Sequence, residues 1–227
     1  MNKLAFHHLY KCGGLYIVNR YQAEPGFAYC RRPDEIVLNY GNPVELTRHP
    51  VAEAEQLGVT VVMGHGVTPQ LAGDYAHAAM LRDPIRRVVS GYNFHRLEMN
   101  LLYGVHTTVD FDSWFINRER VLPSAFHWQY SHWGDTQEHA EAGLRDMDHV
   151  FILGRDHITG IDRLFQQYGL APDPEWTLTH NTADSLSKLG MRYITWADLS
   201  SDSKQRVLDE IAPERDFFKL AMELAGC

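Results

Sequence analysis

The segment around residues 82–90 carries side chains suited to binding a phosphate. Arg82 comes directly before Asp83-Pro84, a pair typical of a helix start, because Asp accepts hydrogen bonds from first-turn amides and Pro fits the first helical position. Ser90 follows about two turns later on the predicted helix. A guanidinium, a helix start and a hydroxyl in this order can together bind a phosphate. An ordinary strand–helix unit with solvated arginines would show the same spacing.

A second anion-binding candidate lies near the N-terminus. Lys11 precedes Cys12 and the pair Gly13-Gly14. Glycines let backbone amides approach an anion closely, and the lysine adds a full charge. The order differs from the nucleotide-kinase P-loop, in which Gly-Lys-Ser/Thr comes last. A simple Gly-Gly turn is the alternative interpretation.

The elements that must position these residues alternate between strands and helices. This alternation predicts a single α/β domain over residues 1–227, with a central, mostly parallel sheet flanked by helices in three layers. Residues 21–50 are expected to be loop with one strand at 35–39, and residues 177–187 are expected to be loop. We predict strands at 4–8, 59–63, 75–81 and 149–153, and helices from 15, at 51–58, from 68, at 84–102, 111–118, 121–130, 135–145, 156–168, 200–211 and 213–225. The helix at 135–145 is expected to begin with a capping box, Asp135 to Glu138.

Three polar residues each follow a predicted strand: Lys11, His65 and Arg82. In a parallel sheet the carboxyl ends of the strands meet at one edge, and ligands bind outside that edge. The three side chains are therefore expected to converge on one site, which an ordinary strand–helix unit does not predict.

Composition narrows the classes of partner. The 227 residues are 44% hydrophobic and 22% charged, as in ordinary globular proteins, and the net charge is −8. An acidic chain disfavours nucleic-acid binding through a basic surface. The sequence contains no apolar run long enough to span a bilayer and no signal-peptide pattern at its start. The three widely spaced cysteines form no metal or redox motif, so we expect a reducing, cytoplasmic setting.

Both anion-binding segments resemble motifs of the sulfotransferases that use 3′-phosphoadenosine 5′-phosphosulfate (PAPS). Residues 11–15, Lys-Cys-Gly-Gly-Leu, resemble the 5′-phosphosulfate loop of that family, and residues 82–92 resemble its 3′-phosphate motif, Arg-Asp-Pro-x-x-Arg-x-x-Ser-x-Tyr. Gly64-His65 and the segments 151–154 and 214–220 are similar to the branch that contains heparan 2-O-sulfotransferases and other carbohydrate sulfotransferases. The resemblance implies a P-loop-like fold and spans most of the chain in the right order.

The resemblance assigns a role to each matching residue. Lys11 and the amides of Cys12, Gly13, Gly14 and Leu15 would bind the 5′-phosphosulfate, and Lys11 would also stabilise charge on the bridging oxygen as the sulfuryl group leaves.

Arg82 and Ser90 would bind the 3′-phosphate, and His65 would be the general base on the acceptor hydroxyl. His65 could instead be a histidine satisfied by neighbouring backbone. Arg87 also matches the motif, but it could equally pair with Asp83 on the same helix. His8 matches a family histidine and is interpreted as structural.

The implied reaction is an in-line sulfuryl transfer from PAPS to a hydroxyl of a small molecule or glycan, leaving adenosine 3′,5′-bisphosphate. It needs no metal and no covalent intermediate, because positioning and charge stabilisation supply most of the rate. The sequence identifies neither the acceptor, nor the residues that bind adenine, nor the oligomeric state.

The loop departs from the family pattern at three positions. Tyr10 stands where proline is expected, and Cys12 and Leu15 stand where threonines are expected, so hydroxyl contacts would be lost while amide contacts remain. Two alternatives stay open: a P-loop nucleotide-dependent phosphotransferase, and a non-catalytic nucleotide or glycan binder of the same fold.

Histidines and aromatic residues suggest two weaker features. His127, His132 and His139 are the densest histidine group, but their spacing does not match the pairs that ligate zinc on one helix face. An aromatic-rich region is expected to be core, with part of it available to stack on a sugar: Trp114, Phe115, Phe126, Trp128, Tyr130 and Trp133.

Overall fold

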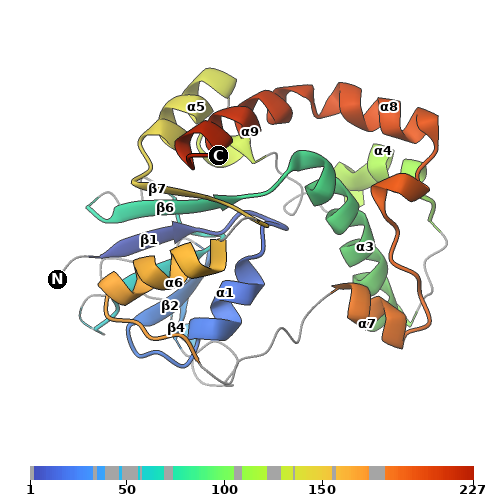
Figure 1. Ribbon diagram of the computed structural model, residues 1–227. Helices are drawn as coiled ribbons and strands as arrows, with labels where there is room; N and C mark the ends of the chain where they lie inside the picture. The colour runs from blue at the N-terminus through green and yellow to red at the C-terminus, as the bar shows by residue number, and fades with distance from the viewer. Residues whose placement is uncertain are drawn as a thin grey trace.

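A seven-stranded sheet forms the centre of the computed structural model, with the strand order β4-β3-β2-β5-β1-β6-β7 (Figure 1). The structure describes residues 3–32, 35–38, 46–47, 56, 58–68, 74–104, 109–121, 129–134, 136–154, 157–173 and 182–227. The strands are β1 (Leu4–His7), β2 (Phe27–Arg32), β3 (Glu35–Leu38), β4 (Leu46–Thr47), β5 (Val61–Gly64), β6 (Ala76–Leu81) and β7 (His149–Ile152).

Strand β1 lies between β5 and β6 and pairs in parallel with both. The parallel part continues to β2 beside β5 and to β7 beside β6, whereas β3 and β4 add an antiparallel edge. The chain runs from β1 to β2 on one side and crosses later to β6 on the other. The winding direction thus reverses beside β1, and ligands of open α/β sheets bind beyond the carboxyl ends of the strands at such a point.

Helices cover both faces of the sheet, and a further group lies beyond one side of it (Figure 1). Helices α1 and α6 lie on one face and α5 and α9 on the other, while α3, α4, α7 and α8 lie together at the side. The helices are α1 (Gly14–Tyr21), α3 (Pro84–Tyr103), α4 (Phe111–Val121), α5 (Gln137–Arg145), α6 (His157–Gln167), α7 (Thr182–Lys188), α8 (Ser201–Glu210) and α9 (Ala212–Leu224), with short 3₁₀ turns η2 (Tyr130–His132) and η3 (Trp196–Asp198).

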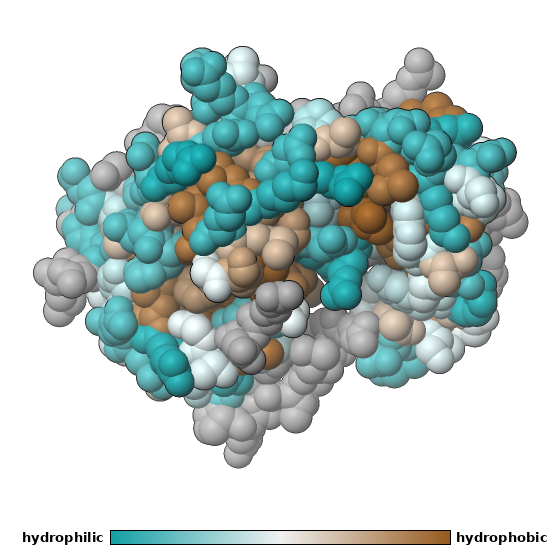
Figure 2. Space-filling model, turned by 45° about the horizontal axis from the view of Figure 1, so that its top comes forward, coloured by the Kyte–Doolittle hydropathy of each residue, from teal (hydrophilic) through white to brown (hydrophobic). Residues whose placement is uncertain are grey.

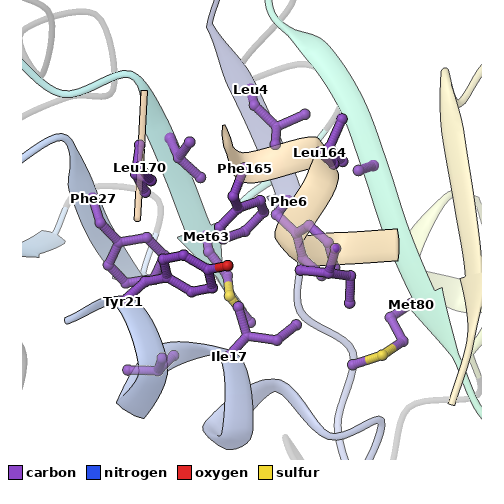
Figure 3. Close-up of a cluster of buried hydrophobic side chains, with 14 of the residues drawn as sticks. Leu4, Phe6, Ile17, Tyr21, Phe27, Met63, Met80, Leu164, Phe165 and Leu170 are labelled. Carbon is purple, nitrogen blue, oxygen red and sulfur yellow. The ribbon is translucent and has the colours of Figure 1, made fainter. Parts of the chain in front are cut away.

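The core between the sheet, α1 and α6 fixes how α1 begins beside β1 (Figure 3). Phe6 of β1 meets Phe165 of α6 edge to face, with ring centroids 5.6 Å apart, and Tyr21 of α1 packs on the same ring at 4.7 Å. Arg20 of α1 also binds Asp162 of α6 through two hydrogen bonds of 2.9 and 2.7 Å. The N-terminal end of α1 is therefore held at the carboxyl end of the sheet.

Helix α3 begins as the sequence predicts. Asp83 is the N-cap, its side chain accepts a hydrogen bond of 2.8 Å from the amide of Arg86, and Pro84 is the first helical residue. Val88, Val89 and Tyr92 then pack against α4 and α8 in one apolar cluster. The junction between β6 and α3, where Arg82 lies, is thus fixed on both sides.

The α/β class and the mostly parallel central sheet are confirmed. The strands predicted at 4–8, 59–63, 75–81 and 149–153 correspond to β1, β5, β6 and β7 within a few residues, and the helices predicted at 84–102, 156–168, 200–211 and 213–225 correspond to α3, α6, α8 and α9. The helix expected from residue 15 is α1 and that at 111–118 is α4. The helix predicted from residue 68 lies outside the described residues beyond Thr68, and so do most of the helices predicted at 51–58 and 121–130.

Three expectations are wrong. Phe27–Arg32 is strand β2, although its proline- and glycine-rich flanks suggested loop. Thr182–Lys188 is helix α7, whose single buried residue, Leu186, gives no helical period in the sequence. Helix α5 is capped one residue later than expected, by Thr136, whose side chain accepts a hydrogen bond from the amide of His139.

The surface of the molecule carries hydrophobic residues in separate patches among hydrophilic side chains, as the face in Figure 2 shows. No helix in the described part of the chain is long and apolar enough to cross a membrane.

Candidate active site

The carboxyl ends of β1, β5 and β6 bring the three predicted residues to one edge of the sheet. Lys11 follows β1, His65 follows β5 and Arg82 follows β6, and β1 lies between the other two strands. Arg82 donates a hydrogen bond of 3.0 Å from Nη1 to the carbonyl oxygen of Lys11. The ring of His65 stacks on that of His8, with centroids 4.1 Å apart. The predicted convergence is therefore present, at the point where the winding of the sheet reverses.

The loop between β1 and α1 forms a concave turn of backbone. Lys11 and Gly13 both have left-handed φ values, 60° and 84°, and Gly13 caps α1 without a side-chain hydrogen bond. Within the described structure the amides of Gly13, Gly14 and Leu15 have no hydrogen-bond acceptor. A turn with left-handed backbone, followed by first-turn amides that lack acceptors, can bind an anion.

Cys12 faces away from that turn. Its amide donates to the carbonyl of Leu9 at 3.2 Å, and its buried thiol donates to Oε1 of Gln129 at 3.3 Å. Burial raises the pKa of the thiol to about 12, so the side chain stays protonated. Of the four amides predicted to bind the donor, that of Cys12 is thus already bonded within the loop.

Gly14 is required by the packing of His8. A Cβ atom at Gly14 would lie 1.9 to 2.4 Å from atoms of the His8 ring. The same ring stacks on that of His65. Desolvation lowers the pKa of His65, and a hydrogen bond with the His8 backbone offsets part of this shift. His65 is nevertheless exposed to solvent. His8 therefore links the position of the loop to that of the candidate base, which agrees with its structural interpretation.

Lys11 holds its charge in an environment with little water. Its Nζ lies 3.8 Å from the centroid of the Phe94 ring on α3 and 5.9 Å from that of Tyr10. Burial and the charge of Arg82 lower the pKa of Lys11 to about 8, against a smaller opposite effect of Glu98. Within the described part of the chain Lys11 makes no ion pair.

Arg82 is the other cation of the site, and among the described residues no carboxylate lies at ion-pair distance from it. Desolvation lowers its pKa by more than the nearby groups that favour its charge, Asp83 among them, raise it. Its backbone amide and carbonyl both bond to the side chain of Gln129, at 2.8 and 2.9 Å. Two adjacent, desolvated cations of this kind create a strong preference for an anionic ligand.

Arg87 and Ser90 are buried on α3, 0% and 5% exposed. Arg87 makes an ion pair of 2.9 Å with Glu214 at the start of α9, and both side chains are fully buried. Asp83, the partner considered from the sequence, instead caps α3. Arg87 therefore joins α3 to α9 and is held in a structural contact.

Three histidines form a chain of hydrogen bonds beneath the site. His7 shares a hydrogen bond of 2.8 Å with His132 and one of 3.0 Å with His77. Burial lowers the pKa of His7 well below its usual value and that of His132 to about 4, so both are neutral near pH 7. His139 is exposed and separate from them, and His127 lies outside the described residues. No group of three potential metal ligands occurs within the described residues.

The aromatic-rich region belongs mainly to the core where it is described. Trp114 and Phe115 pack with α3 and α8, and Trp133 packs against Phe217 of α9. Phe126 and Trp128 lie outside the described residues.

Sequence reasoning missed Gln129 and Phe94, and gave Glu214 only as part of a loosely similar segment. No motif marks Gln129, whose role depends on contacts with residues 47, 85 and 117 positions away.

A cavity of about 620 Å³ lies near the other end of the sheet, lined by residues including Gly26, Thr60 and Tyr168, away from these polar groups.

No protein-family model matches the chain, and no curated protein matches it. Among solved structures, a sulfotransferase from Alicyclobacillus acidocaldarius is similar over 100% of this chain and 96% of its own, with 13% identity and a TM-score of 0.53. The fold is that of a sulfotransferase. A retinol dehydratase in complex with androsterone and the inactive cofactor PAP matches over 81% of this chain and 44% of its own, with 16% identity. The TM-score of this match is 0.31.

Proposed function

We propose that the chain is a sulfotransferase that moves a sulfuryl group from PAPS to an acceptor hydroxyl. The observation that carries this proposal is the pair of desolvated cations, Lys11 and Arg82, at the switch point of a sheet with the sulfotransferase fold. They lie beside three amides that have no acceptor among the described residues, so the site offers contacts for an anion from both strand ends.

The two ends of the donor would be bound by different segments. Lys11 and the amides of Gly13, Gly14 and Leu15 would bind the 5′-phosphosulfate, in keeping with the concave backbone turn. Arg82 would bind the 3′-phosphate through its guanidinium together with the Ser90 hydroxyl, as the resemblance of residues 82–92 implies.

The reaction would be an in-line displacement. His65 would take the proton from the acceptor hydroxyl as its oxygen attacks sulfur, because its neutral imidazole can accept a proton near pH 7. The bond between sulfur and the bridging oxygen would break, and Lys11 would stabilise the negative charge that remains on that oxygen. The acceptor in this proposal is a carbohydrate, as the similarity to the heparan branch implies.

Binding of adenosine 3′,5′-bisphosphate tests the donor site. We expect calorimetry and thermal shift to show binding of this compound in preference to ATP–Mg²⁺, and Arg82→Ala to weaken it about tenfold or more, since a charged hydrogen bond is lost. Arg86→Ala is the matched control, because Arg86 is exposed on the first turn of the same helix. A preference for ATP–Mg²⁺ would instead favour a P-loop phosphotransferase.

Sulfate transfer from labelled PAPS tests the activity. Desulfated heparan oligosaccharides should accept label in preference to simple phenols, and His65→Ala should lower turnover by ~10²–10⁴ without weakening bisphosphate binding. His139→Ala is the control, because that side chain is exposed away from the site. Bisphosphate binding without transfer to either class of acceptor would identify a binding protein.

A further inference from the structure

The buried side chain of Gln129 connects both parts of the candidate donor site. Gln129 is 1% exposed and precedes η2. Its Oε1 accepts hydrogen bonds from the amide of Arg82 at 2.8 Å and from the thiol of Cys12 at 3.3 Å. Its Nε2 donates to the carbonyl of Arg82 and to Oε1 of Glu214, both at 2.9 Å. An amide offers two acceptor and two donor positions, and all four are used here.

The contacts with Arg82 replace those of a neighbouring strand. Strand β6 ends at Leu81, so the backbone of Arg82 lies just beyond the sheet ladder. Gln129 bonds both the amide and the carbonyl of that residue, which fixes the direction in which its side chain leaves the sheet. Loss of these bonds would leave polar backbone groups without partners, which is costly when they are away from water.

The same amide also holds the loop after β1. Gln129 bonds Cys12, whose neighbour Lys11 accepts a hydrogen bond from the Arg82 guanidinium. The loop and the strand end are thus joined twice, once through Gln129 and once directly. A closed set of contacts of this kind keeps the two segments at a fixed separation.

The network is anchored on the helices at its far end. The Glu214 carboxylate accepts a hydrogen bond of 3.2 Å from the backbone N–H of Gln129 and one of 3.0 Å from Nη2 of Arg87. Both charged side chains are fully buried, and moving either one would break a buried ion pair of 2.9 Å, which is costly. The position of Gln129 is therefore set by α3 and α9 as well as by the sheet.

We propose that Gln129 is a positioning residue that fixes the distance between the 5′ and 3′ phosphate-binding segments. The fixed distance makes the site selective for a nucleotide that carries both phosphates. Both phosphates can bind at once only when the two segments keep that distance. The selectivity rests on the proposed function, whereas the coupling between Arg82 and the loop does not.

Hydrogen exchange on the free protein tests the coupling without any ligand. In Gln129→Met, a substitution of similar size, the amide of Arg82 should exchange about ten to a hundred times faster, since its acceptor is lost. The amides of Phe6 and Met80 within the sheet ladder should keep their protection. Unchanged exchange at Arg82, or an equal acceleration throughout β1 and β6, would overturn the proposal.

Three nucleotides test the selectivity: adenosine 3′,5′-bisphosphate, adenosine 5′-monophosphate and adenosine 3′-monophosphate. In Gln129→Met the Kd of the bisphosphate should rise about tenfold or more, and each monophosphate Kd by less than about threefold. In the bisphosphate, binding of one phosphate holds the other close to its own segment. This advantage is lost when the distance between the two segments can change. A proportional weakening of all three would show a merely structural role.

A pair of substitutions at Cys12 provides a milder test that preserves the rest of the network. Cys12→Ser keeps a hydrogen-bond donor toward Gln129, so it should retain the ratio of bisphosphate to monophosphate affinity. Cys12→Ala lacks that donor and should lower the ratio. Equal ratios in the two variants would contradict a coupling through this contact. If the wild type binds none of the nucleotides, the proposed function fails, and the exchange experiment alone decides whether Gln129 couples the two segments.

Discussion

Raising the pH from 7 to 9 should weaken bisphosphate binding through the loss of one proton. Burial and the charge of Arg82 lower the pKa of Lys11 to about 8, so the side chain is mostly charged below that pH and mostly neutral above it. The other ionisable groups of the loop change little in this interval. The pKa of His65 is lowered from 6.5, and that of Cys12 is raised to about 12.

The size of the effect follows from the protonated fraction. With a pKa of about 8, Lys11 is about nine-tenths protonated at pH 7 and about one-tenth protonated at pH 9. If only the protonated form binds the phosphate strongly, the Kd rises about tenfold over this range. A phosphate monoester has its second pKa near 6, so the ligand itself keeps its charge throughout.

Calorimetry at half-unit pH steps measures the curve. Wild-type affinity should be constant below about pH 7.5 and fall above pH 8, with net proton uptake on binding near pH 8 because the bound anion raises the pKa of the lysine. Lys11→Arg should remove the pH dependence, since a guanidinium stays protonated. A wild-type Kd that is constant from pH 7 to 9 without proton uptake would refute the placement of Lys11 at the ligand.

Three further substitutions probe the surroundings of the site. Gly14→Ala should displace the His8 ring and lower both bisphosphate affinity and turnover about tenfold or more, with little change in far-UV circular dichroism, because the added Cβ overlaps that ring. Glu214→Gln should destabilise the protein by about 3–5 kcal/mol in urea titrations, since the fully buried Arg87 charge loses its partner; a loss below about 1 kcal/mol would contradict this. Phe94→Leu should shift the midpoint of the pH curve downward by about 0.4 to 1.5 units, because a cation–π contact worth ~0.5–2 kcal/mol is removed. An unchanged midpoint would show that the ring does not stabilise the ammonium.

The parts of the fold that the sequence predicts are those with strong local signals. Leu4–His7 and Val61–Gly64 are short apolar runs, and both are buried strands of the parallel sheet. Asp83-Pro84 predicts the start of α3 because the cap and the proline act within one turn. Strand β2 and helix α7 were missed because tertiary contacts, rather than their own residue pattern, stabilise them.

In the candidate site, too, the sequence predicts some features and not others. Lys11, His65 and Arg82 were predicted to meet because each follows a strand, and parallel topology alone brings strand ends together. The partner of Arg87 was not predicted, since Glu214 lies 127 positions away and sequence spacing only suggested Asp83. Contacts between side chains from distant segments carry no period or cap, so the sequence contains no local signal for them.

The unusual residues of the loop also acquire a physical explanation. Cys12 stands where the family has threonine, yet its side chain points to Gln129 rather than to the free amides, so the loss of that hydroxyl does not remove the concave turn. Tyr10 lies beside Lys11, where its ring adds to the apolar surroundings that Phe94 provides. A loop with fewer hydroxyl donors must bind an anion mainly through backbone amides and charge. Two desolvated cations that form no ion pair among the described residues, Lys11 and Arg82, supply that charge.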